Sequence, residues 1–269
     1  MKIKNKFFVI LSVMLLIGVL AFITSFSPKD NQNDGSSTGK PVDNVDESEQ
    51  LTISFLGDSI STYSGWSNNS FYNSTLTQNV TCYPMASSDR NDIRGVSDTY
   101  WAQVIEELNL RLCVNNSCDA SRVSDTRTDN IPCGMVRASE LHRTSYTPDI
   151  IVVYIGTNDI ANGISLEVFT ESYRTMVNAI NESYPRAEVY LCTLLPERRY
   201  SDDALLCSFN DAIKSIAAES SCTVVDFYTD SSITWDNYTS YTIDNLHPNA
   251  AGMDKLTECI VNTIKKANK

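Results

Sequence analysis

Apolar and polar positions alternate along most of the chain in blocks that predict strands followed by helices. The clearest strand is the continuous apolar run at residues 150–155, which is bounded by Asp149 and Gly156. A strand that is apolar on both faces is typical of a parallel sheet covered on both sides. The same criteria predict strands at residues 51–56, 110–114, 150–155, 188–194 and 223–227. Apolar residues three and four positions apart predict helices at residues 99–110, 135–142, 166–184, 203–219 and 250–266.

This alternation predicts a three-layer α/β/α sandwich with a mainly parallel, flavodoxin-like five-stranded sheet. In sheets of this kind, ligands bind in the crevice beyond the carboxyl ends of the strands. Polar residues that directly follow a strand are therefore the first candidates for chemistry.

The N-terminal 50 residues do not share the strand–helix pattern. Lys2, Lys4 and Lys6 precede an uncharged run from Phe7 to Phe26, which is long enough to cross a bilayer as a helix. The lysines predict that the N-terminus stays in the cytoplasm and that the rest of the chain is exported. The run lacks a small-residue cleavage site at its end, which favours an uncleaved transmembrane anchor at residues 1–26 over a signal peptide. Either interpretation places the remainder outside the cytoplasm, tethered to the cell membrane or secreted.

The composition of the remaining chain sets its domain organisation and its partners. Residues 27–50 are rich in Asp, Asn, Ser and Gly, which predicts a disordered linker. Residues 51–269 are enough for one domain with its own core. The chain carries 33 acidic and 21 basic residues, a net charge of −12. Because such a surface repels phosphate groups, we expect no nucleic-acid partner, and membrane contact through the N-terminal segment only. The oligomeric state does not follow from the sequence.

Eight cysteines bear on the redox chemistry of the chain. An even number in an exported domain permits disulfides, and the candidates in loop-rich segments are Cys82, Cys113, Cys118 and Cys133. Cys192 lies inside a predicted strand, which favours a buried free thiol. The chain has no C-x-x-C pair and only two histidines, so we expect neither a metal site nor another cofactor.

Three polar clusters stand where the sheet predicts chemistry. They are Gly-Asp-Ser-Ile-Ser at 57–61, Gly-Thr-Asn-Asp at 156–159 and Asp-Asn-Leu-His-Pro-Asn at 244–249. A serine hydroxyl becomes nucleophilic when a histidine removes its proton, and a carboxylate can fix the histidine tautomer. His142 lies in a helix-like segment and is interpreted as structural or surface-exposed, so His247 is the candidate base. Each cluster taken alone also fits a turn that caps a helix.

In this order and with similar spacing, the three clusters resemble those of the SGNH (GDSL-like) hydrolase superfamily. The resemblance covers residues 51–266. The stretches at 97–101, 114–117 and 121–124 are similar to those of a subgroup of bacterial cell-surface members.

The resemblance implies a role for each candidate residue. Ser59 is the nucleophile, His247 is its base and Asp244 orients the imidazole. The side-chain amide of Asn158 and the backbone N–H of Ser59 donate hydrogen bonds to the oxyanion. The third donor in this family is a glycine N–H, at a place where this chain has Ala120. An alanine N–H can serve if its φ is negative, whereas a loop that needs a positive φ would misplace the donor.

The resemblance and the expected location together predict a serine esterase that removes O-acetyl or other short acyl groups from extracellular glycans. The alternatives are a lipase or lysophospholipase-type esterase and a non-catalytic surface binding protein on the same scaffold. Aromatic side chains that either stack on sugar rings or belong to the core are Tyr63, Trp66, Tyr72, Tyr100 and Trp101.

Overall fold

The centre of the protein is a five-stranded sheet in which every strand pair is parallel, with the order β2-β1-β3-β4-β5. The computed structural model describes residues 50–66, 83–84, 91–125 and 131–268, which belong to one compact unit. The strands are β1 (Thr52–Gly57), β2 (Arg111–Ser117), β3 (Ile150–Tyr154), β4 (Glu188–Cys192) and β5 (Thr223–Val225). The predicted α/β class and five-stranded sheet are confirmed, with the difference that the sheet is parallel throughout.

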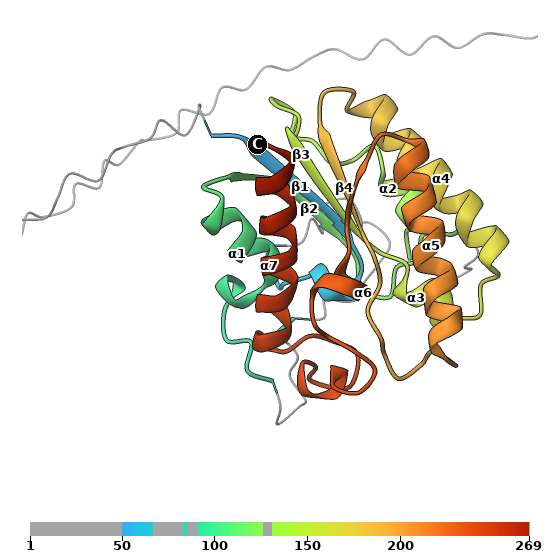
Figure 1. Cartoon of the computed structure of the whole chain (residues 1–269). Helices are drawn as coiled ribbons and strands as arrows, with labels where there is room; N and C mark the ends of the chain where they lie inside the picture. Colours follow the sequence, from blue (N-terminus) through green and yellow to red (C-terminus); the bar gives the residue numbers. More distant parts are fainter. Residues whose placement is uncertain (1–49, 67–82, 85–90, 126–130, 269) are drawn as a thin grey trace, which may run out of the picture. The chain divides into compact units, whose positions relative to one another are not determined.

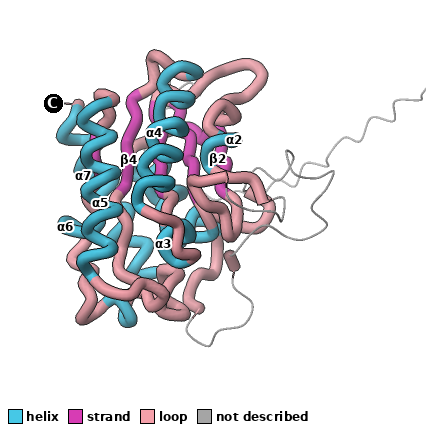
Figure 2. Tube along the Cα trace, turned by 90° about the vertical axis from the view of Figure 1, so that its right-hand side faces the viewer, coloured by secondary structure: helices cyan, strands magenta, loops and turns pink. Residues whose placement is uncertain are grey.

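Helices cover both faces of the sheet (Figure 1). One face carries α1 (Tyr100–Glu107) and α7 (Ala250–Ala267), which pack against each other. The other face carries α2 (Gly134–Arg137), α4 (Leu166–Ser183) and α5 (Asp203–Glu219). Figure 2 views the molecule from the side of α4 and α5, with the strands behind them. Short helices lie in the connections, namely η1 (Ser59–Ser61), η3 (Val96–Asp98), α3 (Thr157–Ala161), α6 (Phe227–Asp230) and η4 (Tyr238–Ser240).

The long helices begin where the sequence supplies a capping side chain. Ser165, Asp202 and Asn249 each accept a hydrogen bond from a backbone N–H in the first turn, at 3.3, 2.8 and 3.0 Å respectively. These caps satisfy N–H groups that have no partner within the helix. They explain why α4, α5 and α7 start at the residues that the sequence pattern predicts.

Two elements differ from their predicted extents. β2 continues three residues beyond Val114, because Asn115 and Asn116 are buried in the strand and donate side-chain hydrogen bonds to the carbonyls of Ser61 and Glu140. The helix predicted at 135–142 instead ends at Arg137. The Tyr184 hydroxyl donates to the Ser139 carbonyl and accepts from the Leu141 N–H, so it replaces the hydrogen bonds that would continue the helix.

The carboxyl ends of the strands share one edge of the sheet, at the bottom of Figure 1. There the blue turn after β1 lies close to the red segment that leads into α7. The parallel register places Gly57 opposite Ser117 and Tyr154 at the ends of β1, β2 and β3. The loops that follow these strands therefore meet in one place.

The predicted anchor at 1–26 and nearly all of the predicted linker at 27–50 lie outside the described residues. Within the described residues, no helix combines the length and apolar character that a membrane span requires.

Candidate active site

The nucleophile candidate Ser59 begins a tight turn directly after β1. The carboxylate of Asp58 caps this turn by accepting the Ile60 N–H at 3.0 Å. A β-carbon added at Gly57 would lie 2.9 Å from Ser117 Oγ and still closer to Ser61, so only glycine fits where the strand enters the turn. The close fit at Gly57 before Ser59 and the Asp58–Ile60 hydrogen bond across it therefore fix the position of Ser59.

His247 and Asp244 complete a chain of hydrogen bonds that starts at Ser59. His247 Nε2 lies 3.0 Å from Ser59 Oγ, and His247 Nδ1 lies 3.0 Å from Asp244 Oδ2. The other carboxylate oxygen of Asp244 accepts the backbone N–H groups of Leu246 and His247 at 3.1 and 2.8 Å. This geometry matches the arrangement in which a carboxylate orients a histidine base toward a serine.

The electrostatic surroundings favour an ionised Asp244. Partial burial acts to raise the pKa of this carboxyl group, but the hydrogen bonds from His247, its charge and the Leu246 N–H outweigh burial and hold the pKa well below its usual range. Asp58 behaves in the opposite way, since burial raises its pKa to about 6 despite the hydrogen bond from Ile60. Two carboxyl groups whose pKa values both respond to His247 are therefore shifted in opposite directions.

The loop that carries His247 is held by the distant Tyr83 and by a hydrogen bond within the loop itself. The Tyr83 hydroxyl donates to the Pro248 carbonyl at 2.8 Å, and the Tyr83 ring packs edge-on against the imidazole. The Ile243 N–H donates to the His247 carbonyl at 2.7 Å. Tyr83 has no position-specific signal in the sequence, so its role could be found only in the structure.

Asn158 lies in α3, directly after β3, and its side chain is oriented at both ends. Its Nδ2 donates to the Ser121 carbonyl at 3.0 Å, and its Oδ1 accepts from Arg199 Nη1 at 3.3 Å. An amide nitrogen carries two hydrogens, so one N–H remains for an oxyanion. Asn158 is only 6% exposed, which suits an electrostatic role in a site with little water.

Ala120 has a φ of +55°, in the left-handed region that favours glycine. The loop therefore needs the positive φ that the sequence left open, and alanine adopts it at a cost of about 1–2 kcal/mol. Asp159 holds this loop by accepting the backbone N–H groups of Val123 and Ser124 at 2.8 and 3.1 Å. Ala120 therefore does not meet the condition of a negative φ under which its N–H was expected to serve as the third donor.

The Arg137 side chain connects the Ser59 turn to the Ala120 loop through hydrogen bonds. Its guanidinium is fully buried and donates to the Gly57 carbonyl at 3.0 Å, to Ser121 Oγ at 2.7 Å and to the Asn116 carbonyl. These partners are uncharged oxygen atoms. The signal that could have found it is an arginine inside an otherwise apolar segment at 133–138.

Other sequence candidates lie elsewhere. His142 is exposed, and its Nδ1 lies 3.0 Å from the Tyr184 hydroxyl, in agreement with a structural or surface position. Tyr100 and Trp101 are buried in the core and cannot stack on a sugar, whereas Trp66 is 52% exposed. Tyr63 is partly buried, and Tyr72 lies outside the described residues.

Three of the four predicted disulfide candidates, Cys113, Cys118 and Cys133, lie within the described residues. Cys113 and Cys133 are free thiols, as are Cys192, Cys207, Cys222 and Cys259. The interpretation of Cys113 and Cys133 as disulfide candidates is therefore wrong. Cys113 also cannot pair with Cys118, because about five residues of extended chain separate them by about 16 Å, whereas a disulfide needs Cα atoms within about 7 Å. The buried free thiol predicted at Cys192 is confirmed. Cys82 lies outside the described residues.

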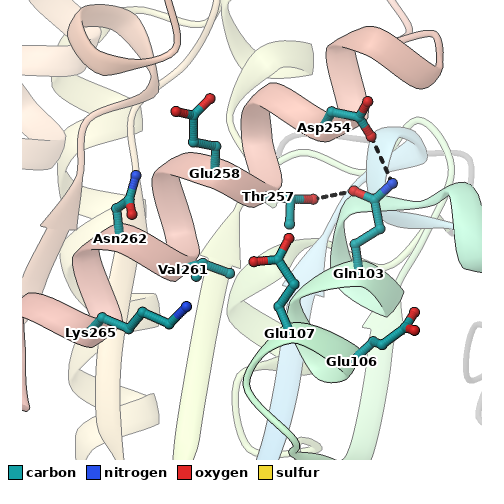
Figure 3. Close-up of a pocket in the computed structure, with 9 residues that line it drawn as sticks. All are labelled: Gln103, Glu106, Glu107, Asp254, Thr257, Glu258, Val261, Asn262 and Lys265. Atoms are coloured by element: carbon teal, nitrogen blue, oxygen red, sulfur yellow. Dashed lines mark hydrogen bonds between the residues drawn. The ribbon is translucent and has the colours of Figure 1, made fainter.

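The described residues enclose a small pocket beside the site and a larger groove away from it. A small, mostly apolar pocket of about 10 Å³ is lined by Ile60, Thr157, Leu246 and Pro248, each next in sequence to a site residue, among others. A larger groove of about 370 Å³ lies between α1 and α7, with an acidic lining that includes Glu106, Glu107, Asp254 and Glu258 (Figure 3). Because the groove is built from two helices away from the carboxyl edge of the sheet, it does not belong to the site. Within the described residues, no group of three or more His, Cys, Asp or Glu side chains could hold a metal ion.

The sequence is similar to those of known ester hydrolases. The family model described as the GDSL-like lipase/acylhydrolase family matches residues 55–255. A multidomain esterase from Ruminococcus flavefaciens is 30% identical over 116 residues, which cover 41% of this chain and 15% of that protein.

Solved structures show the same fold at low identity. A protein described as a GDSL-like lipase from Bacteroides ovatus has a TM-score of 0.63 and 22% identity, covering 81% of this chain and 99% of that one. An active-site mutant of a family two carbohydrate esterase from Clostridium thermocellum, in complex with cellohexaose, has a TM-score of 0.57 and 16% identity. That match covers 85% of this chain and 65% of the other. A carbohydrate esterase family 2 enzyme from Corynascus thermopiles has a TM-score of 0.57 and 20% identity, covering 81% of this chain and 66% of the other.

Proposed function

The chain belongs to the ester-hydrolysing GDSL-like lipase/acylhydrolase family, and we propose that it removes O-acetyl or other short acyl groups from extracellular glycans. The observation that carries the catalytic assignment is the continuous hydrogen-bond chain from Ser59 through His247 to Asp244. The other histidine of the chain, His142, contacts the Tyr184 hydroxyl and not Ser59.

The geometry supports acyl transfer to water in two steps. Ser59 Oγ attacks the ester carbonyl while His247 Nε2 takes its proton, and the carbonyl oxygen becomes an oxyanion. The second N–H of the Asn158 amide and the backbone N–H of Ser59 stabilise that charge. His247 then gives the proton to the departing alcohol oxygen, which leaves an acyl-serine. A water molecule, deprotonated by His247, attacks the acyl-serine and releases the carboxylic acid and free Ser59.

The small pocket beside the site supports a short acyl group. Four of its lining residues neighbour Ser59, Asn158 or His247 in sequence, and a volume of about 10 Å³ holds at most about one water-sized group. Long acyl chains would have to lie outside it. For this reason we favour acetyl esters over the long-chain esters of a lipase.

The glycan assignment rests on one exposed aromatic side chain and on the relatives. Trp66 follows Ser59 by seven positions, and its ring centroid lies 6.1 Å from that of buried Trp101, which supports it from one side. An exposed indole held in this way suits stacking against a sugar ring. Carbohydrate esterases among the structural relatives support the same substrate class.

One set of assays tests the activity and the substrate class together. The purified protein should release acetate from acetylated polysaccharide and from p-nitrophenyl acetate, and Ser59→Ala should abolish both activities. A p-nitrophenyl ester series from acetate to octanoate should show a steep fall in kcat/KM with chain length. Trp66→Ala should raise KM for the polysaccharide and leave KM for p-nitrophenyl acetate unchanged. The control is Trp235, a partly buried tryptophan whose Nε1 donates to Asp203, and Trp235→Ala should change neither KM. A fluorophosphonate probe that does not label Ser59 would support the non-catalytic binding protein instead.

We also propose that the domain works outside the cytoplasm, held by residues 7–26. The uncharged run and the preceding lysines support this location. Membrane fractionation and protease accessibility on intact cells test it. A full-length protein that is protected from protease or found in the cytosolic fraction would contradict the location but not the catalytic assignment.

A further inference from the structure

We propose that Arg199 is a positioning residue that orients the Asn158 amide toward the oxyanion and polarises it. This inference rests on the proposed esterase function, because it concerns the donor that would stabilise the oxyanion. Arg199 is not part of any of the three polar clusters in the sequence, and it reaches the site from the loop between β4 and α5.

The Asn158 amide has only one favourable orientation. Its nitrogen faces the Ser121 carbonyl at 3.0 Å and its oxygen faces the Arg199 guanidinium at 3.3 Å. A flip would place the N–H₂ group against the guanidinium N–H and the amide oxygen against the Ser121 carbonyl. Both contacts would then be repulsive, so the two partners together select the rotamer that presents an N–H donor to the substrate.

Arg199 is itself anchored by a buried acid. Glu197 is 2% exposed, and its carboxylate accepts the Arg199 Nε at 2.8 Å and the Arg199 backbone N–H at 2.9 Å. The guanidinium fork thus uses Nε for Glu197 and Nη1 for Asn158. The neighbouring Arg198 N–H donates to the Asn245 carbonyl at 3.3 Å, next to Asp244. The segment 197–199 therefore contacts both the oxyanion side and the histidine loop.

The charge of Arg199 adds to its orienting effect. A cation on the amide oxygen withdraws electron density from the nitrogen, which makes the remaining N–H a stronger donor. The Arg199 side chain is 31% exposed, so screening by water reduces this effect without removing it. Because the effect acts on a charge that forms in the transition state, it should change kcat and leave KM nearly unchanged.

A double-mutant cycle tests whether Arg199 acts through Asn158. With p-nitrophenyl acetate, we expect Arg199→Met to lower kcat about 10- to 100-fold and Asn158→Ala to lower it about 10²- to 10³-fold. In the Asn158→Ala background, Arg199→Met should lower kcat by no more than about twofold. Full additivity, an effect confined to KM, or an unchanged kcat in Arg199→Met would each overturn the proposal.

Two further variants separate positioning from folding and from net charge. Arg199→Met leaves the buried Glu197 without its partner, so Glu197→Gln/Arg199→Met is measured beside it. The kcat loss should persist in this double variant with thermal stability restored toward the wild-type value; recovery of kcat together with stability would overturn the proposal.

Arg199→Lys keeps the charge, but one ammonium cannot serve Glu197 and Asn158 as the fork does. We expect a reduced kcat, and wild-type kcat in Arg199→Lys would count against positioning.

The controls distinguish this inference from the proposed function. If Ser59→Ala retains activity, the esterase assignment itself fails. If Ser59→Ala and Asn158→Ala lose activity as expected while the Arg199 variants do not, only the role of Arg199 is wrong.

Discussion

His247 Nε2 lies 3.0 Å from Ser59 Oγ, although the two residues are 188 positions apart in the chain. Ser59 is placed by the end of β1, and His247 is placed by the segment that leads into α7. The contact exists because the sheet brings both to its carboxyl edge. The bond to Asp244 on the other side of the imidazole sets which nitrogen faces the serine.

Asp244→Asn should separate the role of the carboxylate from that of the fold. The asparagine oxygen can keep the backbone hydrogen bonds from Leu246 and His247, but the amide can no longer stabilise the protonated imidazole. We expect kcat for p-nitrophenyl acetate to fall by about 10⁴-fold. Thermal unfolding should stay near that of the wild type, and a small change in kcat would show that Asp244 does not orient His247.

Ala120→Gly should stabilise the protein, which is unusual for a change to glycine. The left-handed φ of +55° costs alanine about 1–2 kcal/mol, and the greater freedom of glycine in the unfolded chain offsets about half of this. A net gain of about 0.5–1 kcal/mol in the free energy of unfolding is expected, with activity retained because the N–H is unchanged. The matched control, Ala179→Gly inside α4, should instead lose about 1 kcal/mol. Equal destabilisation by both changes would contradict this explanation.

Arg137→Met should destabilise the protein through the polar groups that it leaves without a partner. The Asn116 carbonyl, the Gly57 carbonyl and Ser121 Oγ all accept from this buried guanidinium. We expect a loss of about 2–4 kcal/mol in the free energy of unfolding, measured with denaturant. Arg174→Met, at a half-exposed ion pair with Glu219, is the control and should cost less than about 1 kcal/mol. Similar losses for the two variants would show that Arg137 contributes only as an ordinary surface cation would.

The buried Asp58 predicts a pH dependence of stability with a defined sign. Burial raises its pKa in the folded state from 3.8 to about 6, so the folded protein binds the proton more tightly than the unfolded chain does. Stability from this group is therefore present below pH 4 and is lost as the pH rises to about 6, by about 3 kcal/mol in total.

The Asp58→Asn variant isolates this effect. Asparagine keeps an oxygen that can accept the Ile60 N–H but cannot ionise. Relative to the wild type, the variant should gain stability progressively between pH 4 and pH 6, measured by denaturant unfolding. Asp244 has a lowered pKa and contributes with the opposite sign, but it is present in both proteins and cancels in the difference. A difference that stays constant with pH would refute the raised pKa of Asp58.

Most secondary structure followed from local patterns because apolar periodicity and capping residues act over a few positions. The strand at 150–154 is continuous and apolar, and α5 begins after Asp202 and ends at Glu219, as the pattern predicts. The end of β2 was not predictable in this way. Asn115 and Asn116 read as a polar loop, and only the distant carbonyls of Ser61 and Glu140 make their burial in a strand favourable.

The sequence by itself determined the alternation of strands and helices, the family, and the identities of Ser59, Asp244, His247 and Asn158, because these depend on short motifs and local periodicity. Only the tertiary structure decided which partners those side chains have. The positive φ at Ala120, the contact of Arg199 with Asn158, and the buried Arg137 beneath both loops arise between segments far apart in the chain. Such contacts leave no local pattern, since the free energy that fixes them comes from long-range packing and hydrogen bonding rather than from neighbouring residues.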